Sequence, residues 1–155
     1  MVEFNMMNEL RELYQQVILD HSKNPRNFGP LADSNCHADG YNPLCGDKVK
    51  IYLRINGDII EDAKFEGSGC AISTASVSML TDFAKGKKVS EVNDLFDKFH
   101  VLVTEGVLRE DGPDLDKLEV FGGVSEFPMR VKCATLAWHT IKAAFENKKE
   151  AVSTE

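Results

Sequence analysis

The sequence lacks any run of about eighteen apolar residues, the length a helix needs to cross a bilayer. Its first residues also lack the basic and then apolar stretches of a secretory signal. Basic residues are outnumbered by acidic ones, 18 against 25, which gives a net charge of −7. This balance argues against binding to a phosphate backbone or to an anionic membrane. We therefore expect a cytoplasmic protein with no nucleic-acid or membrane partner.

Several catalytic signatures are also missing. The chain has no Ser/His/Asp arrangement, no phosphate-binding glycine loop, no HExxH motif and no internal repeat. Four cysteines are few for a disulfide framework, and thiols stay reduced in the cytoplasm. They are therefore metal ligands, reactive thiols or core residues. With 155 residues, 43% of them hydrophobic, we expect one domain over 1–155 with a frayed tail at about 147–155.

Apolar periodicity predicts the elements of the first half of the chain. A helix is expected from Asn8 to about Asn24, followed by a Pro- and Gly-containing loop. Strict alternation over 49–55 predicts a half-buried strand, and 59–66 returns beside it as a hairpin. We pair Ile55 with Ile59, in preference to a two-residue loop, because this keeps apolar residues on one face. That register places Cys45 opposite Gly69, immediately before Cys70.

The second half is predicted to be mainly helical. A helix begins at Cys70 and stops near Gly86, helical pieces fill 89–124, and a last helix follows Pro128. Cys133 lies on the apolar face of that last helix. The segment 109–114 is a polar break.

Cys45, Asp47, Cys70 and Cys133 form a candidate zinc site. Gly46 allows the backbone to bring Cys45 and Asp47 together, and a helix N-terminus favours the thiolate of Cys70. Three sulfurs and one oxygen would match the tetrahedral coordination of zinc. The alternative stays open, because a single cysteine such as Cys133 is more often a core residue, and these spacings are not a repeated CxxC.

For the other cysteine and the histidines, a structural role is the preferred interpretation. Cys36 and His37 precede Cys45 and are expected in a strand of their own. His139 lies six positions after Cys133, near the opposite side of the helix, and is expected to face solvent. His21 and His100 have no companion at a ligand or nucleophile spacing.

Four motifs together resemble the IscU/SufU/NifU N-terminal family of iron–sulfur cluster assembly proteins, over about residues 8–147. The resemblance implies an α+β fold, a small antiparallel sheet packed against several helices, with a site of Cys45, Asp47, Cys70 and Cys133. The motifs are Ile18-Leu19-Asp20-His21 with Asn24-Pro25-Arg26-Asn27-Phe28-Gly29, Asn42-Pro43-Leu44-Cys45-Gly46-Asp47, Gly67-Ser68-Gly69-Cys70-Ala71-Ile72-Ser73 and Arg130-Val131-Lys132-Cys133.

Within this family the sequence is more similar to the SufU branch. The IscU branch has a histidine directly before its third cysteine, and this chain has Lys132. The chaperone-recognised Leu-Pro-Pro-Val-Lys segment of that branch is not reproduced in residues 126–130. The long separation of Cys70 from Cys133 fits the insertion of SufU-type members, which we place within 98–120.

The resemblance implies that Cys45 accepts persulfide sulfur from a SufS-type cysteine desulfurase, with a SufBCD-type assembly complex downstream. Zinc would hold the Cys45 thiolate deprotonated and masked until the desulfurase displaces it. Arg130 and Lys132 either orient the sulfur anion or are ordinary solvated charges. The alternatives are a scaffold on which a transient iron–sulfur cluster is assembled, and an interaction module with a structural zinc. The chain is thus either a zinc-dependent sulfurtransferase or a non-enzymatic protein.

Overall fold

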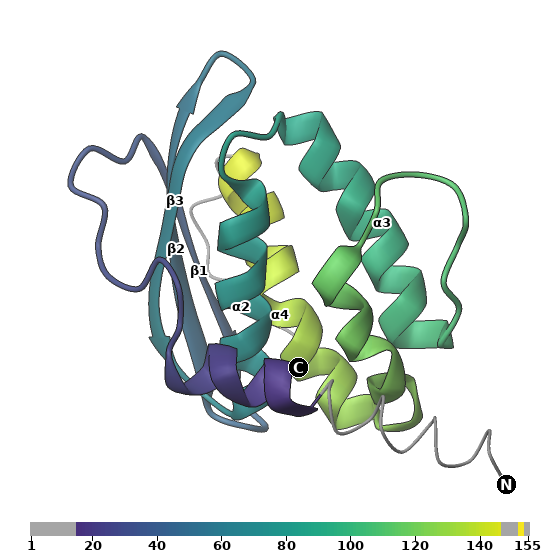
Figure 1. Ribbon diagram of the computed structural model, residues 1–155. Coiled ribbons are helices and arrows are strands. Elements are labelled where there is room, and N and C mark those ends of the chain that lie inside the picture. The colour runs from purple at the N-terminus through teal and green to yellow at the C-terminus, as the bar shows by residue number, and fades with distance from the viewer. Residues whose placement is uncertain (1–14, 147–151, 154–155) are drawn as a thin grey trace, which may run out of the picture.

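The protein is an α+β fold, as the resemblance implies, and the computed structural model describes residues 15–146 and 152–153. Helices α2 and α4 lie side by side against one face of the sheet, with α3 and η1 beyond them (Figure 1). A helix over residues 15–23 comes first. The elements that follow are β1 (Cys36–Asn42), β2 (Asp47–Asn56), β3 (Ile59–Ser68), α2 (Ala71–Ala84), α3 (Val89–Glu105), the 3₁₀ segment η1 (Asp116–Glu126), α4 (Pro128–Phe145) and β4 (Val152–Ser153).

The sheet has the strand order β3-β2-β1-β4. The three long strands are antiparallel, and the two-residue β4 runs parallel to β1. Alternate residues of each long strand face α2 and α4, so apolar and polar residues alternate along the sequence. At one end of this strand pair the core-facing positions are polar: Asn42, the last residue of β1, lies directly opposite Asp47, the first residue of β2.

The β2–β3 hairpin forms as predicted, but its predicted register is wrong by two residues. Leu53 lies opposite Ala63 and Ile51 opposite Phe65. The loop is only Gly57 and Asp58, with Gly57 at φ +65°, and a bulge follows between Arg54 and Ile55. Away from the loop the displacement is even, so Ile51, Ala63 and Phe65 keep their predicted face, and the alternation could not reveal it. Beside the loop the displacement is one residue, and Ile60 replaces Ile59 on the buried face.

The core lies between the sheet and the helices, and its polar groups are paired. Trp138 is fully buried in α4 and stacks on Phe99 of α3 at a centroid distance of 4.3 Å. Its Nε1–H donates to Ser76 Oγ at 3.1 Å, and the Ser76 hydroxyl donates to the Ala134 carbonyl at 2.6 Å. These bonds join α2 to α4, the two helices that present Cys70 and Cys133 to one end of the sheet.

Some predictions concern the ends of the chain. The expected N-cap Asn8 lies outside the described residues, as does most of the expected frayed tail. Two residues of that tail, Val152–Ser153, pair with β1. Over the described ranges, 15–146 with 152–153, no helix combines the length and the apolar character that crossing a membrane requires. The expected helical pieces between 89 and 124 are α3 and η1.

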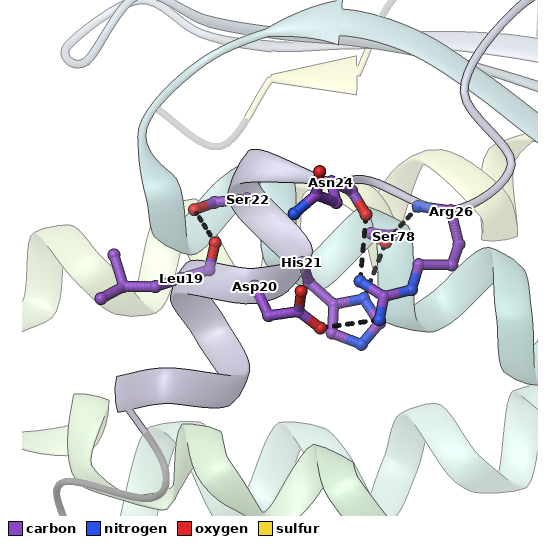
Figure 2. Close-up of polar contacts among 7 residues, drawn as sticks. All are labelled: Leu19, Asp20, His21, Ser22, Asn24, Arg26 and Ser78. Atoms are coloured by element: carbon purple, nitrogen blue, oxygen red, sulfur yellow. Dashed lines mark hydrogen bonds and ion pairs between the residues drawn. The ribbon is translucent and has the colours of Figure 1, made fainter.

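The helix over 15–23 is joined to α2 by a buried hydrogen-bond cluster (Figure 2). His21 is 5% exposed, and its Nδ1 lies 2.8 Å from Ser78 Oγ. The backbone N–H of Arg26 donates to the same oxygen at 2.9 Å, and the Arg26 guanidinium pairs with Asp20 at 2.7 Å. Because Ser78 Oγ accepts from Arg26, its own proton is available to a neutral His21 ring.

This cluster predicts a loss of stability in mild acid. Burial, and then the nearby Arg26 charge, lower the pKa of His21 below its usual 6.5, so the folded protein favours the neutral ring. Unfolding therefore takes up a proton below that pH, and the free energy of unfolding should fall as pH drops from about 7.5 to about 5.5. Denaturant titrations of metal-free protein measure this slope.

The matched variant is His21→Gln, which removes the titrating group. It should have a smaller slope over the same interval than the wild type. Burial also lowers the pKa of His139, so part of the slope should remain until that residue is replaced as well. An identical slope in His21→Gln and wild type would contradict the assignment.

Candidate metal centre

The centre is built on the tight turn between β1 and β2. Residues 43–46 form this turn, and the backbone N–H groups of Cys45 and Gly46 both donate to the Asn42 carbonyl, at 3.3 and 2.9 Å. Gly46 has φ +74°, a conformation that glycine adopts without strain. The turn leaves Cys45 exposed while the next residue but one, Asp47, is fully buried. A reachable sulfur is thus placed beside an enclosed carboxylate.

Asp47 is joined to the beginning of α2. Its Oδ1 accepts the backbone N–H of Cys70 at 2.9 Å, and Cys70 Sγ lies 3.8 Å from its Oδ2. Cys70 is the N-cap of α2, as predicted, and its sulfur accepts the Ser73 N–H at 3.4 Å. Asp47 and the helix N-terminus therefore share one small region.

Cys133 completes the cluster from α4. It is 4% exposed, and its sulfur lies 3.6 Å from the sulfur of Cys45. One donor atom each from Cys45, Asp47 and Cys133 lies within 4.8 Å of the others, close enough for one metal ion. Burial, and then hydrogen bonds with Asp47 and Cys45, raise the pKa of the Cys133 thiol. In metal-free protein Cys133 therefore stays protonated at neutral pH.

The structure brings three of the four predicted ligands into one compact group and places Cys70 at its edge. Cys70 contacts the group through Asp47, and its sulfur faces its own helix N-terminus. The predicted hairpin register put Cys45 opposite Gly69, but Cys45 lies in the β1–β2 turn, outside the strand ladder. Cys70 and Asp47 still meet, because the residue before Cys70 passes directly over the Asp47 side chain.

Gly69 is needed for that close passage. A Cβ at this position would lie 2.6 Å from Asp47 Oδ1, nearer than real carbon atoms come. Gly69→Ala should therefore displace the carboxylate and weaken metal binding by about tenfold or more. Competition with a chromophoric chelator measures the affinity. Gly123→Ala is the matched control, because a Cβ there has no neighbour within 4 Å. Equal affinities in both variants would contradict this placement of Asp47.

The remaining predicted residues have different positions. Arg130, on the first turn of α4, lies over the Phe127 ring at 4.4 Å and lines a cavity of about 540 Å³ together with Ile72. Lys132 is half-buried directly before Cys133. Cys36 begins β1, at the opposite end of that strand from the centre.

The histidines show where spacing along the sequence misleads. His139 is half-buried rather than solvent-facing, because it packs edge-on against Phe96 at a centroid distance of 5.1 Å. His100 does have a companion, since its ring centroid is 6.4 Å from that of His139. These residues come from α3 and α4, and the helix pairing that joins them leaves no spacing signal.

Asn42 is the residue of the centre that sequence reasoning did not single out. It is fully buried, its Oδ1 accepts the Leu44 N–H at 3.1 Å, and its Nδ2–H donates to Cys45 Sγ at 3.5 Å. An asparagine at the beginning of a turn, whose side chain accepts the N–H two residues on, is the usual residue of an Asx turn. The sequence therefore indicated an Asx turn, but it could not show that the amide NH₂ of Asn42 donates to the Cys45 sulfur.

Comparisons with known proteins agree with this architecture. The family model described as the NifU-like N terminal domain matches residues 13–154. The chain belongs to this family. It is 47% identical over 133 residues to the zinc-dependent sulfurtransferase SufU of Bacillus subtilis (strain 168), covering 86% of this chain and 89% of that protein. It is 40% identical over 145 residues to the iron–sulfur cluster assembly scaffold protein IscU of Streptococcus pyogenes serotype M1, covering 94% and 90%.

Solved structures of NifU-like proteins have the same fold. A crystal structure titled as a putative iron–sulfur cluster assembly scaffold protein for the SUF system from Fervidobacterium islandicum AW-1 has a TM-score of 0.74 at 33% identity, covering 83% of this chain and 93% of that one. The N-terminal part of a NifU-like protein from Brucella abortus has a TM-score of 0.78 at 22% identity, covering 86% and 92%. The second likeness supports the fold alone.

Proposed function

We propose that this NifU-like protein works in iron–sulfur cluster assembly as a zinc-bound sulfur acceptor, taking persulfide sulfur from a cysteine desulfurase through Cys45. The observation that supports this most is the contrast within one group of donor atoms. Cys45 is exposed, whereas its neighbours Asp47 and Cys133 are buried. Within this compact group an outside protein can therefore reach the Cys45 sulfur while Cys133 stays enclosed, and Cys70, at the edge of the group, is exposed as well.

The donor set fits zinc. Two cysteine sulfurs and a carboxylate oxygen lie within 4.8 Å of one another, and Cys70 adjoins them through Asp47. Zinc accepts sulfur and oxygen ligands in a tetrahedral site, so Cys45, Asp47, Cys70 and Cys133 would hold it. When bound, zinc would keep the cysteine thiols deprotonated. This matters most at Cys133, where burial raises the pKa of the thiol.

The transfer step is an exchange of one sulfur–sulfur bond. The Cys45 thiolate attacks the outer sulfur of the desulfurase persulfide, and a new bond forms between that sulfur and Sγ of Cys45. The old bond breaks, and its electron pair stays on the desulfurase cysteine, which leaves as a thiolate. The outer sulfur brings its proton with it, so no external oxidant or reductant is needed.

The surroundings of Cys45 suit a protein partner. Leu44, its neighbour in the turn, is 59% exposed, and Phe127 and Met129 are exposed at the beginning of α4. Exposed apolar residues beside a reactive group are typical of an interaction surface. Arg130 and Lys132 lie on the same helix as Cys133, where their positive charges would stabilise negative charge on the reacting sulfurs. A SufS-type desulfurase is the proposed donor, and a SufBCD-type complex the proposed recipient.

All four cysteines are free thiols, which suits a reducing compartment such as the cytoplasm. The test is a single-turnover reaction of the zinc-loaded protein with a cysteine desulfurase and cysteine. Intact-mass analysis should show the addition of one sulfur atom, located on Cys45 by peptide mapping. A protein that stays unmodified while the desulfurase persulfide persists would contradict the proposal.

A second candidate function is a scaffold on which an iron–sulfur cluster is assembled. It is favoured by the similarity to the IscU scaffold protein of Streptococcus pyogenes and by the same group of ligands. A scaffold would hold iron and sulfide together on these residues. We prefer the zinc-bound sulfur acceptor, called the relay below, because Cys45 is exposed whereas Cys133 is buried.

A further inference from the structure

The amide of Asn42 connects the buried core to the reactive sulfur. Its side chain is fully buried at the end of β1, and it makes hydrogen bonds to two successive residues of the turn. The carbonyl half accepts the Leu44 N–H at 3.1 Å, and the NH₂ half donates to Cys45 Sγ at 3.5 Å. Its backbone carbonyl also accepts the Cys45 and Gly46 N–H groups.

The hydrogen bonds of Asn42 to the backbone and its hydrogen bond to sulfur have different effects. The bonds to backbone N–H groups fix the course of the turn, a task that any acceptor at this position could perform. The bond to sulfur is different, because it needs a donor, and a neutral amide supplies one without adding a charge. A hydrogen bond from a buried donor stabilises negative charge on sulfur more than on a neutral thiol.

We propose that Asn42 is a positioning residue for sulfur transfer, holding the Cys45 sulfur in place through its side-chain N–H and stabilising negative charge there. This inference rests on the proposed function. The inference extends that function by assigning a residue outside the ligand set to the acceptor step. The same donor serves the attacking thiolate before transfer and the sulfur chain after it. Asp47 lies directly across the strand pair, and a neutral amide at position 42 adds no second negative charge beside it.

Asn42→Asp removes the donor and places a negative charge beside the sulfur. Aspartate has nearly the same shape and can still accept the Leu44 N–H, but it replaces the N–H beside sulfur with an oxygen. Sulfur acceptance by Cys45 should slow by about tenfold or more, because the thiolate loses a donor and gains a repelling neighbour. The rate of persulfide formation in single-turnover experiments measures the effect.

Asn35→Asp is the matched control. Asn35 also uses both halves of its amide, because its Nδ2–H donates to the Ile55 carbonyl at 2.7 Å and its Oδ1 accepts the Ile55 N–H at 2.8 Å. It lies before β1, at the far end of that strand from the centre. The same chemical change is thus made with no sulfur in contact. Thermal unfolding of both variants shows whether the folds are comparably preserved.

A spectroscopic measurement tests the contact independently of transfer. Cobalt(II) substituted for zinc gives a sulfur-to-metal charge-transfer band, whose energy falls when a thiolate ligand loses a hydrogen bond. The band should move to lower energy in Asn42→Asp and stay unchanged in Asn35→Asp. If Asn42→Asp does not fold, Asn42→Ser removes the donor to sulfur without adding a charge and is measured instead.

The outcomes separate the two proposals. Slower transfer and a displaced band in the Asn42 variant alone support the positioning role. Unchanged transfer and an unchanged band overturn it, as does slowing of the same size in Asn35→Asp. If the wild type accepts no sulfur at all, the proposed function fails, and the cobalt band still decides whether Asn42 bonds to the Cys45 sulfur.

Discussion

Cys45→Ala is expected to abolish sulfur acceptance, lowering the rate by about a hundredfold or more in the desulfurase reaction. The reason is the position of each sulfur. Cys133 is buried, and Cys70, although exposed, is held at the beginning of α2 by the Ser73 N–H and Asp47, whereas Cys45 lies in an exposed turn. Labelled sulfur from cysteine, followed onto the protein under non-reducing conditions, measures the loss.

Cys36→Ala is the control for this result. Cys36 is a free cysteine at the far end of β1, packed against the hydrophobic core, so its removal should leave sulfur acceptance intact. Equal loss in both variants would remove the basis for choosing Cys45. Full acceptance in Cys45→Ala would move the acceptor role to another cysteine, and peptide mapping would identify it.

Removing the metal should lower the melting temperature on the order of 10 °C while leaving the secondary structure in place. A ligand present at about 100 to 1,000 times its dissociation constant adds about 3–4 kcal/mol to stability, and each kcal/mol is worth about 2–4 °C in a chain of this size. The fold should persist because one hydrophobic core joins β1–β3 to α2, α3 and α4 without the centre. Circular dichroism of chelator-treated and zinc-restored protein makes the comparison.

This result also tests the structural-zinc alternative. If zinc only held the fold together, the chelated protein would lose its helical signal, and Cys45→Ser would unfold as well. A folded Cys45→Ser variant that accepts no sulfur supports the acceptor role instead. No change of melting temperature on zinc addition would contradict zinc binding at this centre.

Much of the local structure could be predicted because it depends on nearby residues. The alternation of apolar and polar residues in β2 predicted its buried face. The position of Cys70 before a helical apolar pattern predicted the beginning of α2. Gly46 before Asp47 indicated a backbone turn, which the structure confirms with φ +74°. Each of these features is determined by neighbours within one turn or one strand.

The features that residue spacing does not determine depend on contacts distant in sequence. The predicted hairpin register missed a two-residue loop and a bulge, because beyond the bulge the displacement is even and changes no side-chain face. The 3.6 Å approach of Cys133 to Cys45 depends on the packing of α4 against the sheet, 88 residues away in the chain. The His100–His139 pair and the bond from Asn42 to sulfur likewise result from packing, which spacing alone does not encode.

Elemental analysis for zinc, iron and acid-labile sulfide, in protein purified without oxygen, distinguishes a sulfur relay from a cluster scaffold. The relay predicts about one zinc per chain and no sulfide, because one four-ligand site of sulfur and oxygen donors holds one ion. The same sample should then accept one sulfur on Cys45. Iron with an equal amount of sulfide would contradict the relay and make the centre a cluster scaffold.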